Sequence, residues 1–311
     1  MSPHPVMELN AIALMGATGV GKSALALALA EEAGTSIISC DSMQVYRGLD
    51  IGTAKPGRKE RARVTHHLVD CAGLDEIYSA ARWAAEAADI IARENAAGRT
   101  PLICGGTGLY LQTLLKGISE IPKENSKIRE ELKAIQKEKG TPFLHAMLAE
   151  VDAETATRLS ANDTQRVLRA LAVYRSTGVP LSAWQARGKQ RQVAVDCPVF
   201  VLEIPRETLR ERLAERFHAM LAAGWLKEVE WLQAQRLADT HPAMRAVGYR
   251  QLLAHLRGEC SLEEAVRRGI TATRRYAKRQ QTWFRHQTEA VHGGVEVIEQ
   301  QIGEVLRACR S

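Results

Sequence analysis

The stretch that decides the fold is Leu14–Leu29, LMGATGVGKSALALAL. A short apolar run precedes it, glycines turn the chain, and a segment rich in alanine and leucine follows, as in a helix. Gly16, Gly21, Lys22 and Ser23 match GxxxxGK(S/T), a loop that holds phosphate groups between a strand and a helix. Its backbone N–H groups and the positive end of the helix dipole attract phosphate oxygens. We therefore predict a phosphate-binding loop (P-loop) made of Gly16, Ala17, Thr18, Gly19, Val20, Gly21, Lys22 and Ser23, with Lys22 on the phosphates and Ser23 on Mg²⁺.

The composition is that of a globular protein with a polyanionic partner. The chain has 311 residues, of which 45% are hydrophobic and 25% charged, so it can bury a substantial core. The net charge of +6 favours a partner such as nucleic acid. Six scattered cysteines form no CxxC pair, which indicates free thiols in a reducing compartment. With no signal peptide or membrane-spanning run in the sequence, we expect a cytoplasmic protein.

Asp41 is the first candidate catalytic residue. It follows Ile37–Cys40, a short apolar run that we predict to be a buried strand. Ligands of open α/β sheets bind at the carboxyl ends of the strands, so Asp41 should face the phosphate loop. There it could act as a general base or an indirect metal partner. The alternative role is a helix N-cap, which Asp-Ser also suits.

The next strand is informative because of the residues that follow it. Leu102–Cys104 leads into Gly105-Gly106-Thr107-Gly108, where an ATP-hydrolysing protein usually carries an acid that supports Mg²⁺. A motor or switch NTPase is therefore disfavoured. The Thr107 hydroxyl suits a contact with a phosphate or an acceptor, or else belongs to a simple turn. The pair His66–His67 has no third ligand nearby, so we interpret it as structural.

The chain divides into three segments by its patterns. Residues 121–192 contain almost no strand pattern and many helix formers, which predicts an inserted all-helical domain. Within it, Asp163 should cap a helix on which Arg166 and Arg169 share a face, either for a backbone phosphate or for solvent. Residues 1–120 form the first part of an α/β core, a parallel sheet flanked by helices, and residues 193–311 complete it.

Residues 262–285 form a strongly basic helix in the last segment. It carries seven cations and no acid after Glu264, with Val266, Ile270, Ala277 and Phe284 as an opposing apolar stripe. Tyr276 and Trp283 could stack on bases. A solvated face is the alternative, but the charge pattern favours nucleic-acid contact. On the helix over 209–224, Arg216, or else Arg212, should reach the phosphate loop.

The residues alone leave three functions open. The first is a transferase that holds a diphosphate donor while Asp41 activates an acceptor on a nucleic acid. The second is a small-molecule kinase that uses the same base. The third is a non-catalytic, nucleotide-dependent RNA-binding protein. The missing acid counts against an ATPase cycle, and the long basic helix counts against a small-molecule kinase.

Six sequence blocks together resemble the bacterial tRNA dimethylallyltransferase family. They are GATGVGKS (16–23), DSMQVYRGLDIGTAKP (41–56), GGTGLY (105–110), NDTQRVLRAL (162–171), RAVGYRQ (245–251) and RRYAKRQQTWFR (274–285), in the family's order. The family's loop often has GPTASGK and its fourth block NDPQR, so this chain departs at permissive positions. The resemblance implies a P-loop α/β core with a helical insertion, a Mg²⁺ requirement and a monomer. It implies transfer of a dimethylallyl group from dimethylallyl diphosphate to N6 of the adenosine 3′-adjacent to the anticodon in tRNAs reading codons that begin with U.

The resemblance also assigns roles to residues. Lys22, Asp41, Thr107 and Arg216 would be catalytic, with Asp41 taking the proton of the adenine amine. The P-loop would bind the donor diphosphate, and Ser23 the Mg²⁺. The anticodon stem-loop would contact Asp41, Ser42, Met43, Gln44, Thr107, Arg129, Gln165, Arg166, Val167, Leu168, Arg169, Arg245, Ala246, Val247, Gly248, Tyr249, Arg250, Lys278, Arg279, Gln280, Gln281, Thr282, Trp283, Phe284 and Arg285.

Overall fold

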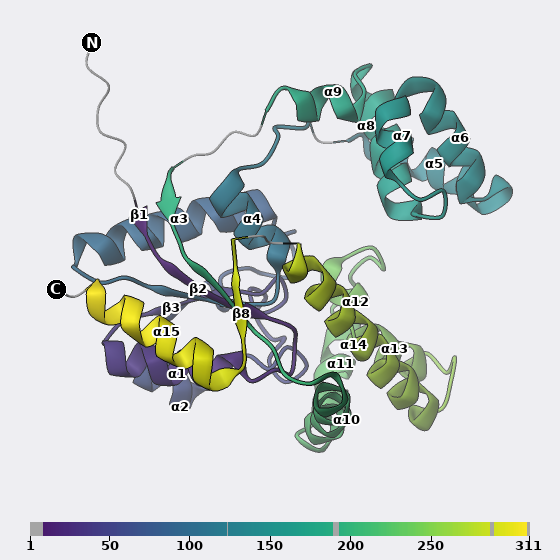
Figure 1. Ribbon diagram of the computed structural model, residues 1–311. Coiled ribbons are helices and arrows are strands. Elements are labelled where there is room, and N and C mark those ends of the chain that lie inside the picture. The colour runs from purple at the N-terminus through teal and green to yellow at the C-terminus, as the bar shows by residue number, and fades with distance from the viewer. Residues whose placement is uncertain (1–8, 123, 189–192, 287–288, 310–311) are drawn as a thin grey trace, which may run out of the picture. The chain divides into compact units, whose positions relative to one another are not determined.

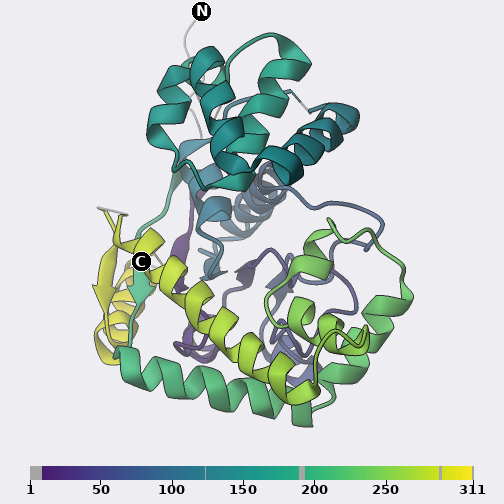
Figure 2. The same ribbon diagram turned by 90° about the vertical axis from the view of Figure 1, so that its right-hand side faces the viewer.

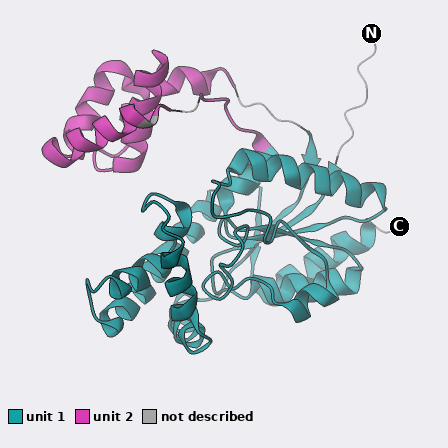
Figure 3. Ribbon diagram, turned by 180° about the vertical axis from the view of Figure 1, so that it is seen from behind, with its two compact units in different colours: residues 1–115, 193–311 teal, residues 116–192 magenta. Residues whose placement is uncertain are grey.

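The computed structural model describes residues 9–122, 124–188, 193–286 and 289–309 (Figure 1). The chain divides into two compact units (Figure 3). The core unit consists of residues 1–115 and 193–311, and the helical unit of residues 116–192. The helical unit includes the residues 121–192 for which the sequence predicts an insertion. None of the helices in the described ranges is long and apolar enough to cross a membrane.

A six-stranded, fully parallel sheet forms the centre of the core unit. Its order is β4 (His66–His67), β3 (Ile37–Cys40), β5 (Leu102–Gly105), β2 (Ile12–Gly16), β7 (Val199–Leu202) and β8 (Val291–Gly293). Every residue of β2, β3 and β5 is buried. Continuous apolar runs such as these are typical of parallel strands covered on both faces. The predicted α/β fold is therefore confirmed. Two short strands, β1 (Leu9–Asn10) and β6 (Val195–Asp196), pair separately.

Helices cover both faces of this sheet (Figure 1). On one face, α1 (Lys22–Ala33) and α15 (Val295–Ala308) share a core with Ile12 and Leu14 of β2. On the other, α3 (Ala80–Ala96) and α4 (Gly108–Lys116) pack on the alternate strand residues. The Trp83 indole, fully buried, donates to the Ser39 carbonyl at 2.8 Å and fixes α3 to β3. The short helix α2 (Arg58–Arg63) precedes β4.

A further group of helices follows β7 and carries the basic helix. They are α10 (Arg206–Ala222), α11 (Trp225–Ala234), α12 (Pro242–Arg245), α13 (Tyr249–Leu256) and α14 (Leu262–Arg285). α10 and α14 pack against each other (Figure 2). A Cβ on Gly269 of α14 would lie only 2.4 Å from the Phe217 ring of α10, so the close approach requires glycine. Through this packing, the basic helix lies next to α10 and contacts β2 of the sheet.

The helical unit has its own hydrophobic core. It contains α5 (Ser126–Lys139), α6 (Thr141–Val151), α7 (Ala153–Arg158), α8 (Thr164–Thr177) and α9 (Leu181–Ala186). Leu132, Leu144, Leu148 and Leu171 are buried together in it. Asp163 accepts from the Arg166 N–H at 3.2 Å, which is the predicted N-cap of α8.

The sequence patterns identified most of the long elements, and they missed short strands and one long helix. The predicted bounds of β3 and of the basic helix agree with the structure. β4 and β8 were not anticipated, because two- or three-residue strands carry no periodicity and gain their identity from the neighbour that they pair with. The 14-residue helix α15 was also missed, although its buried residues Ile298, Ile302 and Leu306 have helical spacing. His66 and His67 form β4 at the sheet edge, and the His66 Nδ1 atom lies 2.8 Å from the Val64 carbonyl oxygen, which agrees with a structural role.

Gly105 offers a test of the sheet packing. A Cβ there would lie 2.1 Å from the Cys40 carbonyl oxygen of β3, a contact with backbone that cannot move aside. We expect Gly105→Ala to lower the free energy of unfolding by about 1–3 kcal/mol in urea denaturation. Gly303→Ala, inside α15, should instead raise it by about 0.5–1 kcal/mol, because only a flexible arginine lies nearby. Equal effects at both sites would contradict this packing.

Candidate active site

The phosphate loop lies between β2 and α1, as the motif requires. Gly19 and Gly21 have φ values of +87° and +99°, which L side chains rarely adopt. A Cβ on Gly16 would lie 2.8 Å from the Leu202 carbonyl oxygen of β7, so the loop starts in close contact with the next strand. The Lys22 ammonium donates to the Ala17 carbonyl at 3.1 Å and curls back over the loop.

Asp41 and Thr107 meet because β3 and β5 are neighbours, with Cys40 opposite Gly105. The Asp41 Oδ1 atom accepts from the N–H groups of Met43 (2.8 Å) and Gln44 (3.3 Å), so it caps a turn and not a helix. Thr107 closes the same turn: its N–H donates to the Cys40 carbonyl (3.1 Å), and its hydroxyl accepts from the Ser42 N–H (3.1 Å). These bonds fix the acid at the carboxyl end of the sheet.

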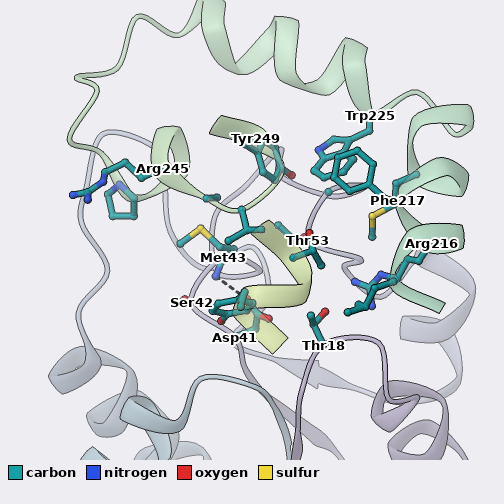
Figure 4. Close-up of a pocket in the computed structure, with 18 of the residues that line it drawn as sticks. Thr18, Asp41, Ser42, Met43, Thr53, Arg216, Phe217, Trp225, Arg245 and Tyr249 are labelled. Atoms are coloured by element: carbon teal, nitrogen blue, oxygen red, sulfur yellow. Dashed lines mark hydrogen bonds between the residues drawn. The ribbon is translucent and has the colours of Figure 1, made fainter. Parts of the chain in front are cut away.

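Two cavities meet at Asp41. The P-loop cavity, of about 110 Å³, has Lys22, Ser23 and Gly105 in its wall. The helix cavity, of about 330 Å³, lies between the end of β3 and α10–α14 (Figure 4). Their walls share Thr18, Asp41, Thr53, Arg216 and Tyr276. A molecule in either cavity therefore reaches the same carboxylate.

The helix cavity has a polar and an apolar end. Figure 4 shows Thr18, Asp41 and Arg216 near one another, and the Phe217 and Trp225 rings together beyond Arg216. The ring centroids of Phe217 and Trp225 are 4.8 Å apart. Arg216 comes from α10 and is partly buried, whereas Arg212, one turn earlier, is exposed. The structure thus directs Arg216, and not Arg212, into both cavities.

Two cations, Lys22 and Arg216, line the P-loop cavity. Burial lowers the pKa of Lys22 and outweighs the opposing effect of Asp41, and Arg216 lowers it further. Burial also lowers the pKa of Arg216, and Asp41 opposes this shift. Burial raises the pKa of the Cys104 thiol to about 11, so it stays neutral. Two partly desolvated cations and the loop amides therefore lie around the Asp41 carboxylate, with Glu60 as a second acid in the cavity wall. Such cations and amides stabilise a bound polyanion.

The P-loop cavity has oxygen donors for a hard divalent cation. The Ser23 hydroxyl and the Asp41 carboxylate both line it, and Mg²⁺ prefers such ligands. Among the described residues, no three or more His, Cys, Asp or Glu side chains gather to form a complete metal site. The residues present therefore fit a Mg²⁺ ion that takes its remaining ligands from bound phosphates and water, its usual mode with nucleotides and diphosphates.

The charges of the basic helix are not equally available. Arg267 and Arg268 pair with Glu264, whose pKa their hydrogen bonds lower to about 2. The Arg274 guanidinium donates to the Arg210 carbonyl at 3.1 Å. The exposed cations without such a contact in the described structure are Arg275, Lys278, Arg279 and Arg285. The basic surface is therefore concentrated in the C-terminal half of α14.

Two of the residues that are predicted RNA contacts on α14 are buried in this structure. Phe284 is 1% exposed and belongs to the core between the helices and the sheet. Gln280 is 7% exposed, and both ends of its amide bond the protein's own backbone. The other predicted residues, Lys278, Arg279, Gln281, Thr282, Trp283 and Arg285, are at least partly exposed. Gln280 and Phe284 are four residues apart, so they share the buried face of the helix, and the residues between them lie on other faces.

The predicted block 245–250 divides in a similar way. Arg245 and Arg250 are exposed, and Ala246 and Val247 are partly exposed. Gly248 is buried, and a Cβ there would lie 2.1 Å from Trp225, so this position requires glycine for packing. Tyr249 is 1% exposed and donates to Glu228 at 2.5 Å, but it lines the helix cavity together with Arg245 (Figure 4).

Gln44 is committed to the protein's own structure. Its Oε1 atom accepts from the Ser39 hydroxyl at 2.9 Å, and its Nε2 atom donates to the Thr53 and Ala54 carbonyls at 3.1 Å. Its amide holds the loop that reaches the cavity wall at Thr53. Asp41, Ser42 and Met43 line the helix cavity and remain available to a ligand.

In the helical unit the predicted contacts also separate into core and surface. Val167 and Leu168 are buried in its hydrophobic core. Gln165 and Arg166 are exposed, and Arg166 pairs with Asp163 at 3.3 Å. Arg129 and Arg169 both pair with Glu124, at 3.0 Å for Arg169. A single partly buried carboxylate thus orients two of the predicted cations.

Sequence analysis missed Glu228 of α11. Its carboxylate accepts from the N–H groups of Asp50 (2.9 Å), Ile51 (2.7 Å) and Gly52 (3.1 Å). Because Gly52 and Thr53 line the helix cavity, Glu228 positions part of the wall. No local signal marks it, since a lone glutamate on a helix is usually solvated and its partners lie 176–178 residues away.

Together these features define a P-loop α/β enzyme of the group-transfer type. The phosphate loop, the acid at the neighbouring strand end and two inward cations surround two joined cavities. The model of the IPP transferase family matches residues 44–287. The chain belongs to this family.

Curated relatives and solved structures agree with this assignment. The chain is 48% identical to a tRNA dimethylallyltransferase of Halorhodospira halophila, over 92% of this chain and 93% of the relative. It is 47% identical to one of Azorhizobium caulinodans, over 89% of each. The full-length tRNA isopentenylpyrophosphate transferase of Bacillus halodurans superposes with a TM-score of 0.70, at 31% identity and over 97% of each chain. A eukaryotic dimethylallyltransferase acting on tRNA superposes with a TM-score of 0.75, at 27% identity, over 97% of this chain and 78% of that one.

Proposed function

We propose that this protein transfers a dimethylallyl group from dimethylallyl diphosphate to N6 of the adenosine 3′-adjacent to the anticodon, in tRNAs that read codons beginning with U. The observation that carries the proposal is the position of Asp41, which lies in the wall of both the P-loop cavity and the helix cavity. Relatives that are 47–48% identical bear the name of this activity. We propose that the protein acts as a monomer in the cytoplasm.

The P-loop cavity holds the diphosphate of the donor. The loop amides and Lys22 bind its oxygens, and Arg216 approaches from α10 on the other side. Ser23, with Asp41 nearby, would hold a Mg²⁺ ion, which would supply further neutralisation of the diphosphate charge. The donor's reactive carbon then lies toward the walls shared with the helix cavity.

The helix cavity receives the adenine. A loop base can be splayed out of its stack, and RNA loops permit this at modest cost. The cavity has Asp41 at its polar end and aromatic side chains at the other, as a flat, partly polar base requires. Arg245 and Arg279 line the same cavity and are exposed, so they can bind the flanking phosphates.

The reaction is a substitution at the allylic carbon C1. The N6 amine forms a bond to C1, the bond between C1 and the diphosphate oxygen breaks, and diphosphate leaves with the bonding electrons. Asp41 accepts the N6 proton, and such a base contributes about 10²–10⁴ in rate. Thr107 holds the turn that carries Asp41. Lys22, Arg216 and the loop amides stabilise the charge on the departing diphosphate.

The role of Ser23 can be tested by metal titration. We expect Ser23→Ala to raise the Mg²⁺ concentration for half-maximal activity by about tenfold, because one ligand is lost. Ser23→Thr keeps the hydroxyl and should restore the wild-type curve. If Ser23→Ala gives the wild-type titration, the serine does not hold the metal.

The basic surface of α14 can be tested by salt dependence. Lys278→Ala combined with Arg279→Ala should weaken binding of the anticodon stem-loop. It should also reduce the slope of log K against log[salt] by about 1–2, because two phosphate contacts disappear. Arg58→Ala with Lys59→Ala removes the same charges from exposed positions on α2 and should leave the slope unchanged. Equal slopes for both double variants would mean that α14 does not face the RNA.

The direct test of the function uses labelled dimethylallyl diphosphate and unmodified tRNA. Label should enter the tRNA in the presence of Mg²⁺ and without ATP, and nuclease digestion should recover it as N6-isopentenyladenosine. Replacement of the adenosine beside the anticodon by guanosine should abolish incorporation. Phosphorylation of a small acceptor by ATP, without prenyl transfer, would instead identify a kinase.

A further inference from the structure

Gln280 connects three segments that are far apart in the sequence. Its Oε1 atom accepts from the Thr18 backbone N–H of the P-loop at 2.9 Å. Its Nε2 atom donates to the Gly106 carbonyl, in the turn after β5, at 2.8 Å. Thr18 and Gly106 are 262 and 174 residues away from it. Because the side chain is only 7% exposed, water does not compete freely for these bonds.

The surroundings of Gln280 are built for this position. A Cβ on Gly106 would lie 2.3 Å from the Gln280 Nε2 atom, and one on Gly108 would lie 2.2 Å from the Trp283 ring. The turn that carries Thr107 therefore packs directly under α14. On the same helical turns, Lys278 and Arg279 are exposed. One helix thus carries both exposed cations and the glutamine that binds the P-loop.

We propose that Gln280 is a positioning residue and not an RNA contact. It aligns the P-loop, which holds the diphosphate, with the turn after β5 that contains Gly106 and Thr107. Its acceptor end fixes the Thr18 amide, which lines both cavities, and its donor end fixes Gly106 beside Thr107. The inference rests on the proposed prenyl transfer for its effect on rate. Its effect on the P-loop, measured as binding of pyrophosphate, does not depend on that function.

Two substitutions separate the two hydrogen bonds. Gln280→Met has a similar shape and loses both bonds. Gln280→Glu keeps the acceptor for the Thr18 N–H, loses the donor to Gly106 and adds negative charge beside the diphosphate. Gln300→Met, on the exposed face of α15, is the matched control for replacing glutamine by methionine on a helix of the same unit. Thermal melts establish that each variant is folded.

The measurements are binding of inorganic pyrophosphate with Mg²⁺, binding of the anticodon stem-loop, and kcat and KM for the donor. We expect Gln280→Met to weaken pyrophosphate binding about tenfold and to lower kcat/KM for the donor by at least that factor, while the RNA Kd changes less than about threefold. Gln280→Glu should weaken pyrophosphate binding further, since like charges repel. Gln300→Met should match the wild type in each measurement.

Hydrogen exchange gives a measurement that does not depend on activity. The peptide that contains Thr18 should exchange slowly in the wild type without ligands and faster in Gln280→Met. An RNA Kd weakened tenfold with unchanged pyrophosphate binding would overturn the proposal and make Gln280 an RNA contact. Fast exchange at Thr18 in the wild type would overturn it even if the variants fail to fold. If the wild type transfers no prenyl group, the proposed function fails while pyrophosphate binding still decides the role of Gln280.

Discussion

Asp41→Asn should reduce kcat for prenyl transfer by about 10²–10⁴ while leaving the protein folded and able to bind tRNA. The amide keeps an oxygen that can accept from the Met43 and Gln44 N–H groups, so the turn after β3 is preserved. The amide cannot accept the N6 proton, and it also removes the negative charge beside Lys22 and Arg216. Single-turnover transfer with saturating donor measures the chemical step, and filter binding measures the RNA Kd.

The rate and the RNA Kd of Asp41→Asn together distinguish a catalytic base from a residue that only binds RNA. Asp239→Asn, at an exposed position that pairs with Arg257, should leave both quantities unchanged. Full activity of Asp41→Asn would mean that another group accepts the proton. A loss of rate that is matched by a loss of RNA affinity, and reversed at high RNA concentration, would mean that Asp41 serves binding and not catalysis.

Arg216→Gln should lower kcat by about 10²–10³, with a smaller effect on the KM of the donor. The guanidinium lines both cavities, and its attraction to diphosphate grows as the bond to C1 breaks and negative charge accumulates. The effect should therefore be larger in the transition state than in the ground state. Steady-state kinetics with varied donor separates kcat from KM.

The same helix supplies the control. Arg212→Gln removes an identical charge one turn earlier, at an exposed position, and should change kcat less than about twofold. Burial lowers the pKa of Arg216, which means that the charged guanidinium destabilises the folded protein. Arg216→Gln should therefore leave the melting temperature unchanged or raise it. Equal kinetic losses in the two variants would indicate a general effect of charge on RNA binding.

Much of the site could be predicted because its parts are marked locally. The P-loop has a fixed spacing of glycine, lysine and serine, and Asp41 directly follows an apolar run. For a parallel sheet, these two facts are sufficient to expect the acid near the phosphates, because ligand sites collect at the carboxyl ends of strands. The amphipathic pattern of residues 262–285 likewise fixed the bounds of α14.

The features that were missed are those that depend on distant partners. Phe284 and Val167 lie within blocks that mix buried and exposed residues, and the packing of each helix against its core decides which residues remain accessible. Glu228 has no local sequence signature. Its role is visible only in the tertiary structure, where its carboxylate accepts hydrogen bonds from the backbone N–H groups of residues 50–52.

By itself, the sequence determined the α/β class, the phosphate loop, the candidate base and the basic helix, because each depends on the spacing of neighbouring residues. Only the tertiary structure decided that Arg216 and not Arg212 faces the cavities, and that Gln280 faces the P-loop while Lys278 faces outward. The physical reason is that helical periodicity gives every residue a face, but the packing of α10 and α14 on the sheet edge determines which face meets the site.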